Sequence, residues 1–261
     1  EDHDDGEKEF LGHKGRFNGE DIIGLIVQQP ATAQFVARHL YNYFVADEVQ
    51  VPSWLDEPPR DPQAVDAIAD TFVKSGLEIK DTLRFIFNSD FFKDESVWFA
   101  KVKNPAEVVA GTIRLIGDFK EPKPGVMAVG LEGTYQGQDL INPPSVEGWH
   151  TGREWIDTGS LVRRINFVAD RLGDASMPGV KSIIDRLGAK DSLSPQELVD
   201  NCLELLGAVQ IDADTHQEIL DHVNAGGPVV RGASEKDIQA FSQRVTEVLQ
   251  LIASTREYQF G

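Results

Sequence analysis

The residues best suited to chemistry gather in one loop, NPPSVEGWHTGREW, at positions 142–155. Its prolines and glycines restrict and shape the backbone, while Trp149 and Trp155 each supply a large flat apolar surface with an N–H that needs a partner. Arg153 places a guanidinium between them. Such a loop predicts either a ligand site, for a carbohydrate or another planar molecule, or a plug that anchors a long connection to a helical body. Tryptophan and arginine hold loops more often than ligands, so the plug is the favoured interpretation.

The segment after this loop, TGSLVRRINFVADRL at 158–172, has the spacing of an amphipathic helix. The residues expected to face inward are Leu161, Ile165, Val168 and Leu172. Arg164 lies next to this stripe, where it can reach back to loop carbonyls or to an acid, and Asn166 is a second polar group. The predicted ligand-binding residues are therefore Trp149, Arg153, Trp155, Arg164 and Asn166.

The opening stretch EDHDDGEKEFLGHKG offers a second kind of chemistry, metal binding. The candidate ligands are His3, Asp4 and Asp5. A calcium loop of the EF-hand type needs an oxygen ligand at its third position and a glutamate at its twelfth, but these positions hold His3 and Gly12. A mixed histidine and carboxylate site for zinc lacks the spacing of paired histidines that would make it specific. A solvated turn is the favoured interpretation.

The remaining histidines and the single cysteine predict no familiar catalytic arrangement. His39 lies near an apolar helical face and is interpreted as a hydrogen-bonded core residue. Glu218 and His222 are four residues apart, so they form either half of a metal site or a solvated pair. Cys202 shares a face with leucines, which predicts a buried inert thiol. The chain contains neither the G-x-S-x-G nor the phosphate-loop motif, and no cofactor is strongly implied.

The composition excludes several classes of partner. The formal net charge is -18, from 43 acidic and 25 basic residues, which would repel a nucleic acid and an anionic membrane surface. No apolar run approaches the length of a membrane span, and one cysteine allows no internal disulfide. Because the chain starts at Glu1 without a methionine or a signal-like segment, we expect a processed or excised piece.

Helical signals dominate the rest of the chain. Four helices are predicted to begin at a proline after a polar residue, in Gln29-Pro30, Asp61-Pro62, Asn104-Pro105 and Ser194-Pro195. Glu107 and Glu197 follow at the third helical position, where a carboxylate can bond back to the cap. In the helix after Pro30, the apolar residues Val36, Leu40, Tyr43 and Phe44 recur at helical spacing. A last long helix begins near Ser234 with a narrow apolar seam, Ile238, Phe241, Val245, Val248 and Ile252.

Strand signals are nearly absent, and VMAVGLEG at 126–133 is the best candidate for a strand or a buried extended loop. Proline and glycine collect in loops at 52–62, 120–125 and 226–232. The prediction is a mostly α fold: a single helical domain over residues 1–261 with long Pro/Gly-rich loops and at most a minor strand pair.

Several blocks occur here in a familiar order. They are HDDGEKEFLGHKGRFNGEDIIGLIVQQPATAQFVARHLYNYFV, VKNPAEVV, GQDLINPPSVEGW, a REW tryptophan, LVRRINF and the closing LIASTREYQF. Together they resemble the bacterial domain-of-unknown-function family 1800 (DUF1800), with the match expected to cover the C-terminal part of the family's usual length. The positions that match the family pattern are His3, Asp4, Gly6, Lys8, Gly12, Gly15, Pro105, Glu107, Gln138, Pro143, Pro144, Gly148, Trp149, Trp155, Arg164, Asn166 and Phe167. His150 stands where the family has proline, and residues 173–233 match least.

The resemblance implies a setting but no mechanism. Members are bacterial and often exported, and their genes commonly neighbour a second family that resembles sulfatases. We therefore expect an extracytoplasmic binding or scaffold protein, periplasmic or secreted, that works with a co-encoded sulfatase-like partner. The alternative is an enzyme, such as a hydrolase, whose site joins the His3/Asp4 turn to the Trp149/Arg153/Trp155 loop.

Overall fold

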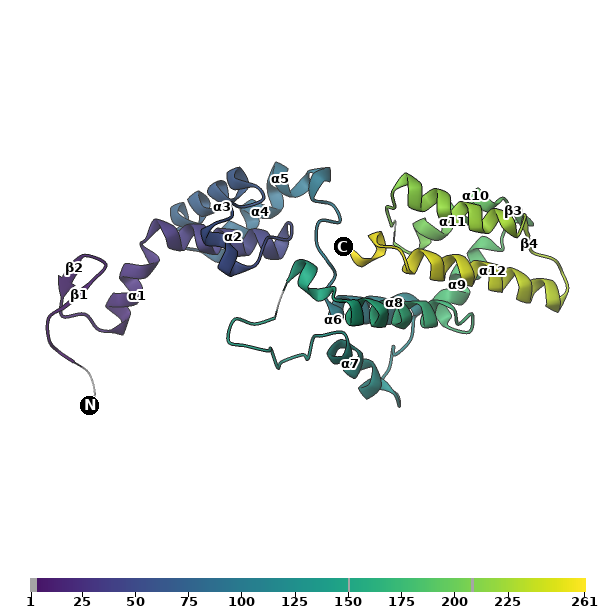
Figure 1. The fold of residues 1–261 in the computed structure, drawn as a ribbon, viewed down its shortest axis with the longest axis horizontal. Helices are drawn as coiled ribbons and strands as arrows, with labels where there is room; N and C mark the ends of the chain where they lie inside the picture. The colour runs from purple at the N-terminus through teal and green to yellow at the C-terminus, as the bar shows by residue number, and fades with distance from the viewer. Residues whose placement is uncertain (1–3, 150, 208) are drawn as a thin grey trace. The chain divides into compact units, whose positions relative to one another are not determined.

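The computed structural model describes residues 4–149, 151–207 and 209–261 and is 61% helical, with two small antiparallel strand pairs. The mostly α prediction is confirmed. The chain divides into two compact units, Glu1–Ala100 and Lys101–Gly261, whose elements are labelled in Figure 1. The prediction of a single domain, with 173–233 as its variable part, stays a prediction.

The first unit is a short hairpin followed by helices. Its elements are β1 (Lys8–Phe10), β2 (His13–Gly15), α1 (Gly19–Val27), α2 (Pro30–Phe44), η1 (Val51–Leu55), α3 (Pro62–Lys74), α4 (Ile79–Asn88), α5 (Asp90–Lys93) and η2 (Glu95–Val97). The two strands pair in antiparallel register, with Phe10 opposite His13. Leu11 and Gly12 at the tip both have positive φ, 50° and 79°, as a two-residue hairpin turn requires.

The core of the first unit lies where α2 packs on α3 and α3 on α4. In α2 the buried residues are Ala33, Ala37, Arg38 and Tyr41, whereas Tyr43 is 73% exposed. The buried face of α2 therefore leaves out Tyr43, although Tyr43 recurs at helical spacing with Val36 and Leu40. Small alanines let α3 approach closely, so the two helices meet along the alanine side and the larger residues flank the contact.

A buried ion pair holds the Pro-rich loop at 52–62. The guanidinium of Arg38 donates to the Glu48 carboxylate at 2.7 Å and to the carbonyl oxygens of Glu57 and Pro58 at 3.0 and 3.1 Å. The other oxygen of Glu48 accepts from the Arg60 backbone N–H at 2.8 Å. Because both charges have full sets of hydrogen bonds, burying them is tolerated, and the loop is fixed at the end where α3 begins.

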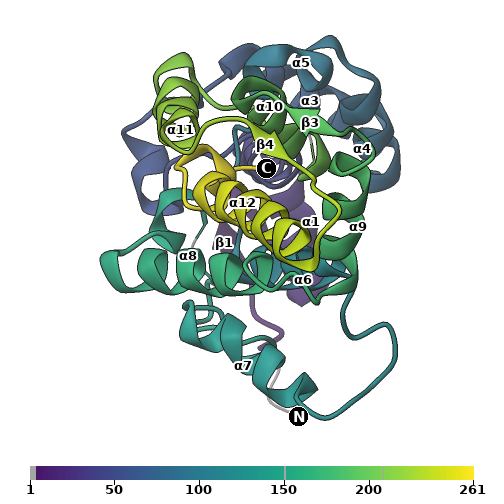
Figure 2. The same cartoon turned by 90° about the vertical axis from the view of Figure 1, so that its right-hand side faces the viewer.

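Seven of the twelve α-helices found in the described residues belong to the second unit. Its elements are α6 (Pro105–Ile116), α7 (Val126–Tyr135), η3 (Gly152–Trp155), α8 (Thr158–Leu172), α9 (Pro178–Leu187), β3 (Ser192–Leu193), α10 (Pro195–Leu205), α11 (Ala213–Ala225), β4 (Val229–Val230), α12 (Glu235–Ala253) and η4 (Glu257–Gln259). Helix α12 packs against both α8 and α10 (Figure 2). The β3 and β4 strands pair antiparallel.

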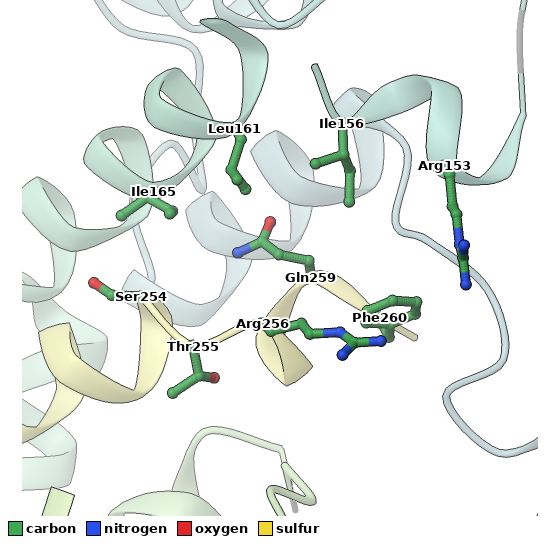
Figure 3. A pocket seen from close by; sticks show the side chains of 9 residues that line it. All are labelled: Arg153, Ile156, Leu161, Ile165, Ser254, Thr255, Arg256, Gln259 and Phe260. Carbon is green, nitrogen blue, oxygen red and sulfur yellow. The ribbon is translucent and has the colours of Figure 1, made fainter. Parts of the chain in front are cut away.

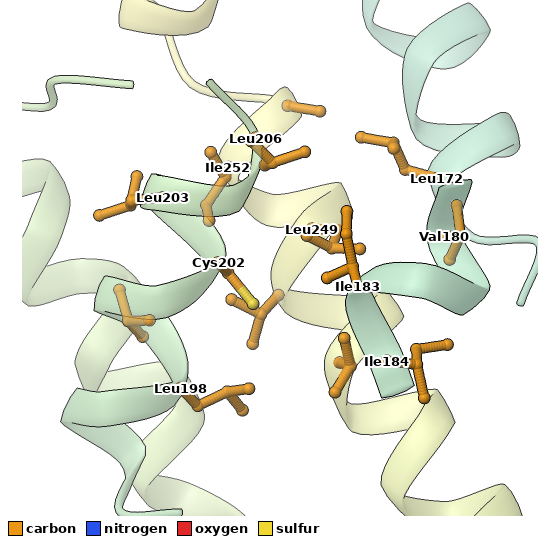
Figure 4. Close-up of a cluster of buried hydrophobic side chains, with 14 of the residues drawn as sticks. Leu172, Val180, Ile183, Ile184, Leu198, Cys202, Leu203, Leu206, Leu249 and Ile252 are labelled. Atoms are coloured by element: carbon orange, nitrogen blue, oxygen red, sulfur yellow. The ribbon is translucent and has the colours of Figure 1, made fainter. Parts of the chain in front are cut away.

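Helix α12 provides the centre of the second core. Phe241, Val245, Val248 and Ile252 are buried on it, as the seam predicted, while Ile238 in the first turn is 42% exposed. Figure 4 shows Cys202 of α10 among leucine and isoleucine side chains of this core. The predicted burial of Cys202 is confirmed, and burial raises the pKa of its thiol to about 12, which disfavours the reactive thiolate.

The helices begin where the proline and capping residues of the sequence predicted. Each of the four prolines opens a helix, and Asn104 and Ser194 both form capping boxes with the glutamates three residues later in the sequence.

The prediction of a strand or an extended loop at 126–133 is wrong, because this stretch forms α7. An isolated strand would leave its backbone groups unpaired, whereas a helix bonds them internally. Among the helices described, none has the length and apolar character needed to cross a bilayer.

Candidate functional site

The loop at 142–155 has two different halves. The first half is exposed, and Figure 1 shows it extending away from α6 and α8 of its own unit. The second half forms the 3-10 turn η3, in which Trp155 is only 8% exposed. The hydroxyl of Ser160 in α8 donates to the Trp155 carbonyl oxygen at 2.9 Å. Trp155 therefore anchors the end of the loop to the first turn of α8.

The other predicted ligand-binding residues of the loop and of α8 differ in burial and in whether they line a pocket. Trp149 is half-buried, and its indole Nε1 is shielded from solvent without a hydrogen-bond partner among the described residues. Arg153 is exposed and lines a pocket, whereas Asn166 is exposed on α8 and lines none of the pockets found in the described chain. His150 lies outside the described residues.

Arg164 is completely buried on α8. Its Nη2 donates to the Lys103 carbonyl oxygen at 2.5 Å, and its Nε donates to Gln259 Oε1 at 3.2 Å, so these acceptors lie outside the 142–155 loop. Its Nη1 has no partner in the described part of the chain. Burial lowers the pKa of Arg164 to about 10, and only the charge of Glu107 opposes this. The guanidinium is thus a buried cation held mainly by neutral acceptors.

Gln259 is fixed by the end of the chain folding back on the start of the second unit. The backbone N–H of Lys103 donates to the Gln259 carbonyl oxygen at 2.9 Å, and Val102 and Phe260 form an antiparallel bridge. A guanidinium carries donors only, so the Gln259 amide must turn its oxygen toward Arg164 and its NH2 group elsewhere. That Nε2 has no partner among the residues described, although Gln259 is 3% exposed.

The pocket beside Gln259 has a volume of about 390 Å³, within the range of small-molecule sites. Figure 3 shows the Gln259 side chain extending below Leu161 and Ile165 of α8. The lining residues are Arg153, Ile156, Leu161, Ile165, Ser254, Thr255, Arg256, Gln259 and Phe260. The described lining thus combines two guanidiniums, one amide donor and a mainly apolar wall, and it includes no carboxylate, although the chain has a net charge of -18.

These groups can bind but offer little for acid–base chemistry. The Ser254 hydroxyl donates to the Gln250 carbonyl oxygen and that of Thr255 to Ile252, both at 2.8 Å, so each is engaged at the end of α12. Among the residues that the structure describes, no histidine, cysteine, aspartate or glutamate lines this pocket. A ligand held here would meet hydrogen-bond donors, positive charge and apolar surface.

Of the predicted metal ligands, Asp4 and Asp5 belong to the described part of the first unit. Asp4 accepts from the Gly6 N–H at 2.8 Å through Oδ1, and its Oδ2 lies 3.7 Å from Lys8 Nζ. Both Asp4 and Asp5 are exposed, and His3 lies outside the described residues. Across the described ranges, no three histidine, cysteine or acidic side chains are grouped so that they could hold a metal ion. The geometry around Asp4 is that of a turn closed by a lysine.

The other histidines lie on or near the surface. His39 is half-buried, with its ring centroid 4.4 Å from Phe35 and 4.6 Å from Trp54. Burial lowers its pKa. His222 and Glu218 are exposed and line a second, polar pocket, with Asp212 and Glu257 among their neighbours.

Sequence reasoning did not identify Gln259 or Arg256. Both belong to the closing STREYQF segment, where the sequence suggested a family match and no site. A glutamine in a short 3-10 turn gives no periodic signal. Only the need of a buried arginine for an acceptor points to such a residue, and the sequence does not reveal which acceptor that is.

Comparison with known proteins gives one relationship. No curated protein and no solved structure matches the chain significantly. Residues 1–260 match the family described as protein of unknown function DUF1800. This match covers almost the entire chain, in agreement with the order of blocks from the opening HDDGEKEF to the closing EYQF. The chain therefore belongs to the DUF1800 family.

Proposed function

We propose that this protein is a binding protein whose second unit holds an organic carboxylate with an apolar body. The observation that carries the proposal is the Gln259 amide, which is buried, oriented by Arg164 and left with an unused N–H donor beside a pocket. A buried donor without a partner costs about 1 to 3 kcal/mol. A ligand oxygen that accepts from Nε2 would recover part of that cost.

The charge and shape of the lining determine the class of ligand. The guanidiniums of Arg153 and Arg256 attract an anion and can donate two parallel hydrogen bonds to a carboxylate. Ile156, Leu161 and Phe260 supply apolar surface for the rest of the molecule. A purely inorganic anion would leave this surface in contact with water, so a carboxylate on a short hydrocarbon fits better.

The cellular context is also a proposal. The resemblance to exported bacterial proteins supports an extracytoplasmic site of action, and the neighbouring sulfatase-like genes support a partner of that kind. Correspondence to the C-terminal part of longer family members stays a prediction. The hydrolase alternative also stays a prediction, since it combines His3 and Asp4 with the tryptophan loop, while the described residues that line the pocket include no general base.

Titration calorimetry with hexanoate and with hexanamide tests the proposal. The two probes share their hydrocarbon chain and differ in charge, so saturable binding of hexanoate with hexanamide about tenfold weaker or worse is expected. Arg153→Gln and Arg256→Gln should each weaken hexanoate about threefold to tenfold, because both side chains are exposed and partly screened.

Arg186→Gln is the matched control, since Arg186 is exposed on α9 of the same unit and does not line the pocket. It removes the same charge and should leave hexanoate affinity within about twofold of the wild type. Equal binding of hexanoate and hexanamide, no saturable binding of either, or equal effects of all three arginine variants would refute the carboxylate site.

A further inference from the structure

The first unit contains a pocket of opposite character, with a volume of about 420 Å³. Its lining residues come from α2, from the loop before α3 and from the α5–η2 segment: Tyr41, Arg60, Asp61, Asp90, Phe91, Asp94, Ser96 and Val97. Three carboxylates and one guanidinium leave this lining with a net formal charge of two negative. We call this set of residues the acidic pocket.

Tyr41 is the unusual member of the acidic pocket. Only 1% of the residue is exposed, yet it lines the pocket. Within the part of the chain that the structure describes, its hydroxyl makes no hydrogen bond. Burial, with the nearby charge of Asp61, raises the pKa of Tyr41 to about 12, so the hydroxyl stays protonated at neutral pH. A buried tyrosine hydroxyl ordinarily has a partner, so this one is available to a ligand.

The carboxylates beside Tyr41 are held in place by helix caps. Asp61 Oδ1 accepts from the Ala64 N–H at 3.0 Å at the start of α3, and Asp94 Oδ1 accepts from the Ser96 N–H at 2.8 Å at the start of η2. The hydrogen bonds from Ser96 also keep the pKa of Asp94 below its ordinary value. Both groups are therefore oriented without help from a ligand.

We propose that the acidic pocket binds an organic cation, a primary ammonium carried on an alkyl chain. The ammonium donates to the carboxylates and to the oxygen of Tyr41, and the Phe91 ring borders the same space and can contact its alkyl chain. A metal ion fits less well, because the described residues contain no group of three acidic or histidine ligands arranged to hold one. A free amine and a lysine side chain of a peptide share this chemistry.

Titration of the full chain with n-butylammonium, monitored by NMR chemical shifts of the backbone amides, tests the proposal. We expect saturable shifts at Ser96 and Val97, and none from n-butanol, which has the same chain without the charge. Nα-acetyl-lysine methylamide distinguishes the sources: affinity at least equal to that of butylammonium indicates a lysine side chain, and weaker binding indicates a free amine. Shifts caused by calcium chloride but not by butylammonium would overturn the proposal in favour of a metal site.

Three variants and one control locate the binding. Tyr41→Phe removes one oxygen and keeps the ring, and should weaken butylammonium about threefold to tenfold. Asp61→Asn and Asp94→Asn keep the helix caps, because asparagine caps as well as aspartate. Each should weaken binding about tenfold.

Asp70→Asn removes the same charge from an exposed position on α3 that pairs with Lys74. It should change the affinity less than about twofold. Because the chain carries a net charge of -18, it attracts any cation to a small, non-specific extent. The Asp70→Asn control measures this non-specific attraction separately from binding in the acidic pocket. Equal losses in Asp70→Asn and Asp94→Asn, or unchanged affinity in both Asp61→Asn and Asp94→Asn, would overturn the proposal, and these tests stand if Tyr41→Phe fails to fold.

Discussion

At the scale of single residues, the two tryptophans of the 142–155 loop have different environments. Trp155 is 8% exposed and its carbonyl oxygen is bonded to Ser160, whereas Trp149 is only half-buried. Truncating a buried tryptophan typically costs about 3 to 5 kcal/mol. We expect Trp155→Ala to lower the melting temperature, followed by circular dichroism, by roughly 10 °C, since 1 kcal/mol corresponds to about 2 to 4 °C at this size.

Trp149→Ala is the comparison within the same loop, and it should lower the melting temperature by less than half as much. A larger loss in Trp149→Ala than in Trp155→Ala would show that the loop is held through Trp149. The sequence could not distinguish the two, because both are tryptophans in a Pro/Gly-rich loop and their burial depends on where η3 meets α8.

At the scale of elements, close approach of α6 and α9 depends on one glycine. A Cβ atom on Gly179, in the first turn of α9, would lie 1.9 Å from the Leu115 carbonyl oxygen and 2.8 Å from the Ile116 carbonyl carbon. Neither backbone atom can move without displacing the end of α6. Gly179→Ala should therefore destabilise the protein by about 2 kcal/mol or more, measured by urea unfolding.

Gly111 in α6 provides the matched control. It is exposed, and a Cβ there would meet nothing within 4 Å. Gly111→Ala should stabilise the protein by about 0.5 to 1 kcal/mol, because alanine has less backbone freedom to lose when the helix forms. If both substitutions had the same sign, the contact between α6 and α9 would not explain the effect.

The helix starts were predictable because they depend on local chemistry. The buried faces of the helices were less predictable because they depend on long-range packing. The helices that begin after Asn104 and Ser194 were predictable, because a capping residue, a proline and a glutamate all lie within four residues. The buried face of α2 depends instead on α3, and alanines mark a close contact only when the partner helix is known. In the described chain residues 126–133 pair with no strand and form a helix, which satisfies their backbone groups internally.

At the scale of the whole molecule, each unit has its own apolar core, and the pocket beside Gln259 in the second unit and the acidic pocket in the first unit have linings of opposite charge. The sequence supplied the total charge of -18 and the family, but not this separation. Charges far apart in the chain meet only after folding: Arg153 joins Arg256, and Asp61 joins Asp94. The candidate sites were therefore predictable in part, through Arg153 and Arg164, while the residues that complete them were not.

Buried phenols and the thiol make the folded chain sensitive to alkali. Burial raises the pKa of Tyr258 to about 12 from an ordinary value of 10.0. Between these values the unfolded chain has released the proton and the folded chain still holds it, so stability falls as pH rises. At pH 11 the difference amounts to about 1.4 kcal/mol. Tyr41 and Cys202, whose pKa values are also raised to about 12, act in the same direction, while the lowered pKa of Arg164 acts in the opposite direction.

Tyr258→Phe isolates one of these groups while it keeps the buried ring. Relative to the wild type, its melting temperature should rise by about 3 °C between pH 8 and pH 11, because the variant has no phenol to titrate. Tyr43→Phe is the control, since Tyr43 is 73% exposed, and its pH dependence should follow that of the wild type. Parallel curves for all three proteins would mean that Tyr258 loses its proton equally easily in the folded and unfolded chains, and the alkaline sensitivity would then have to come from Tyr41 and Cys202.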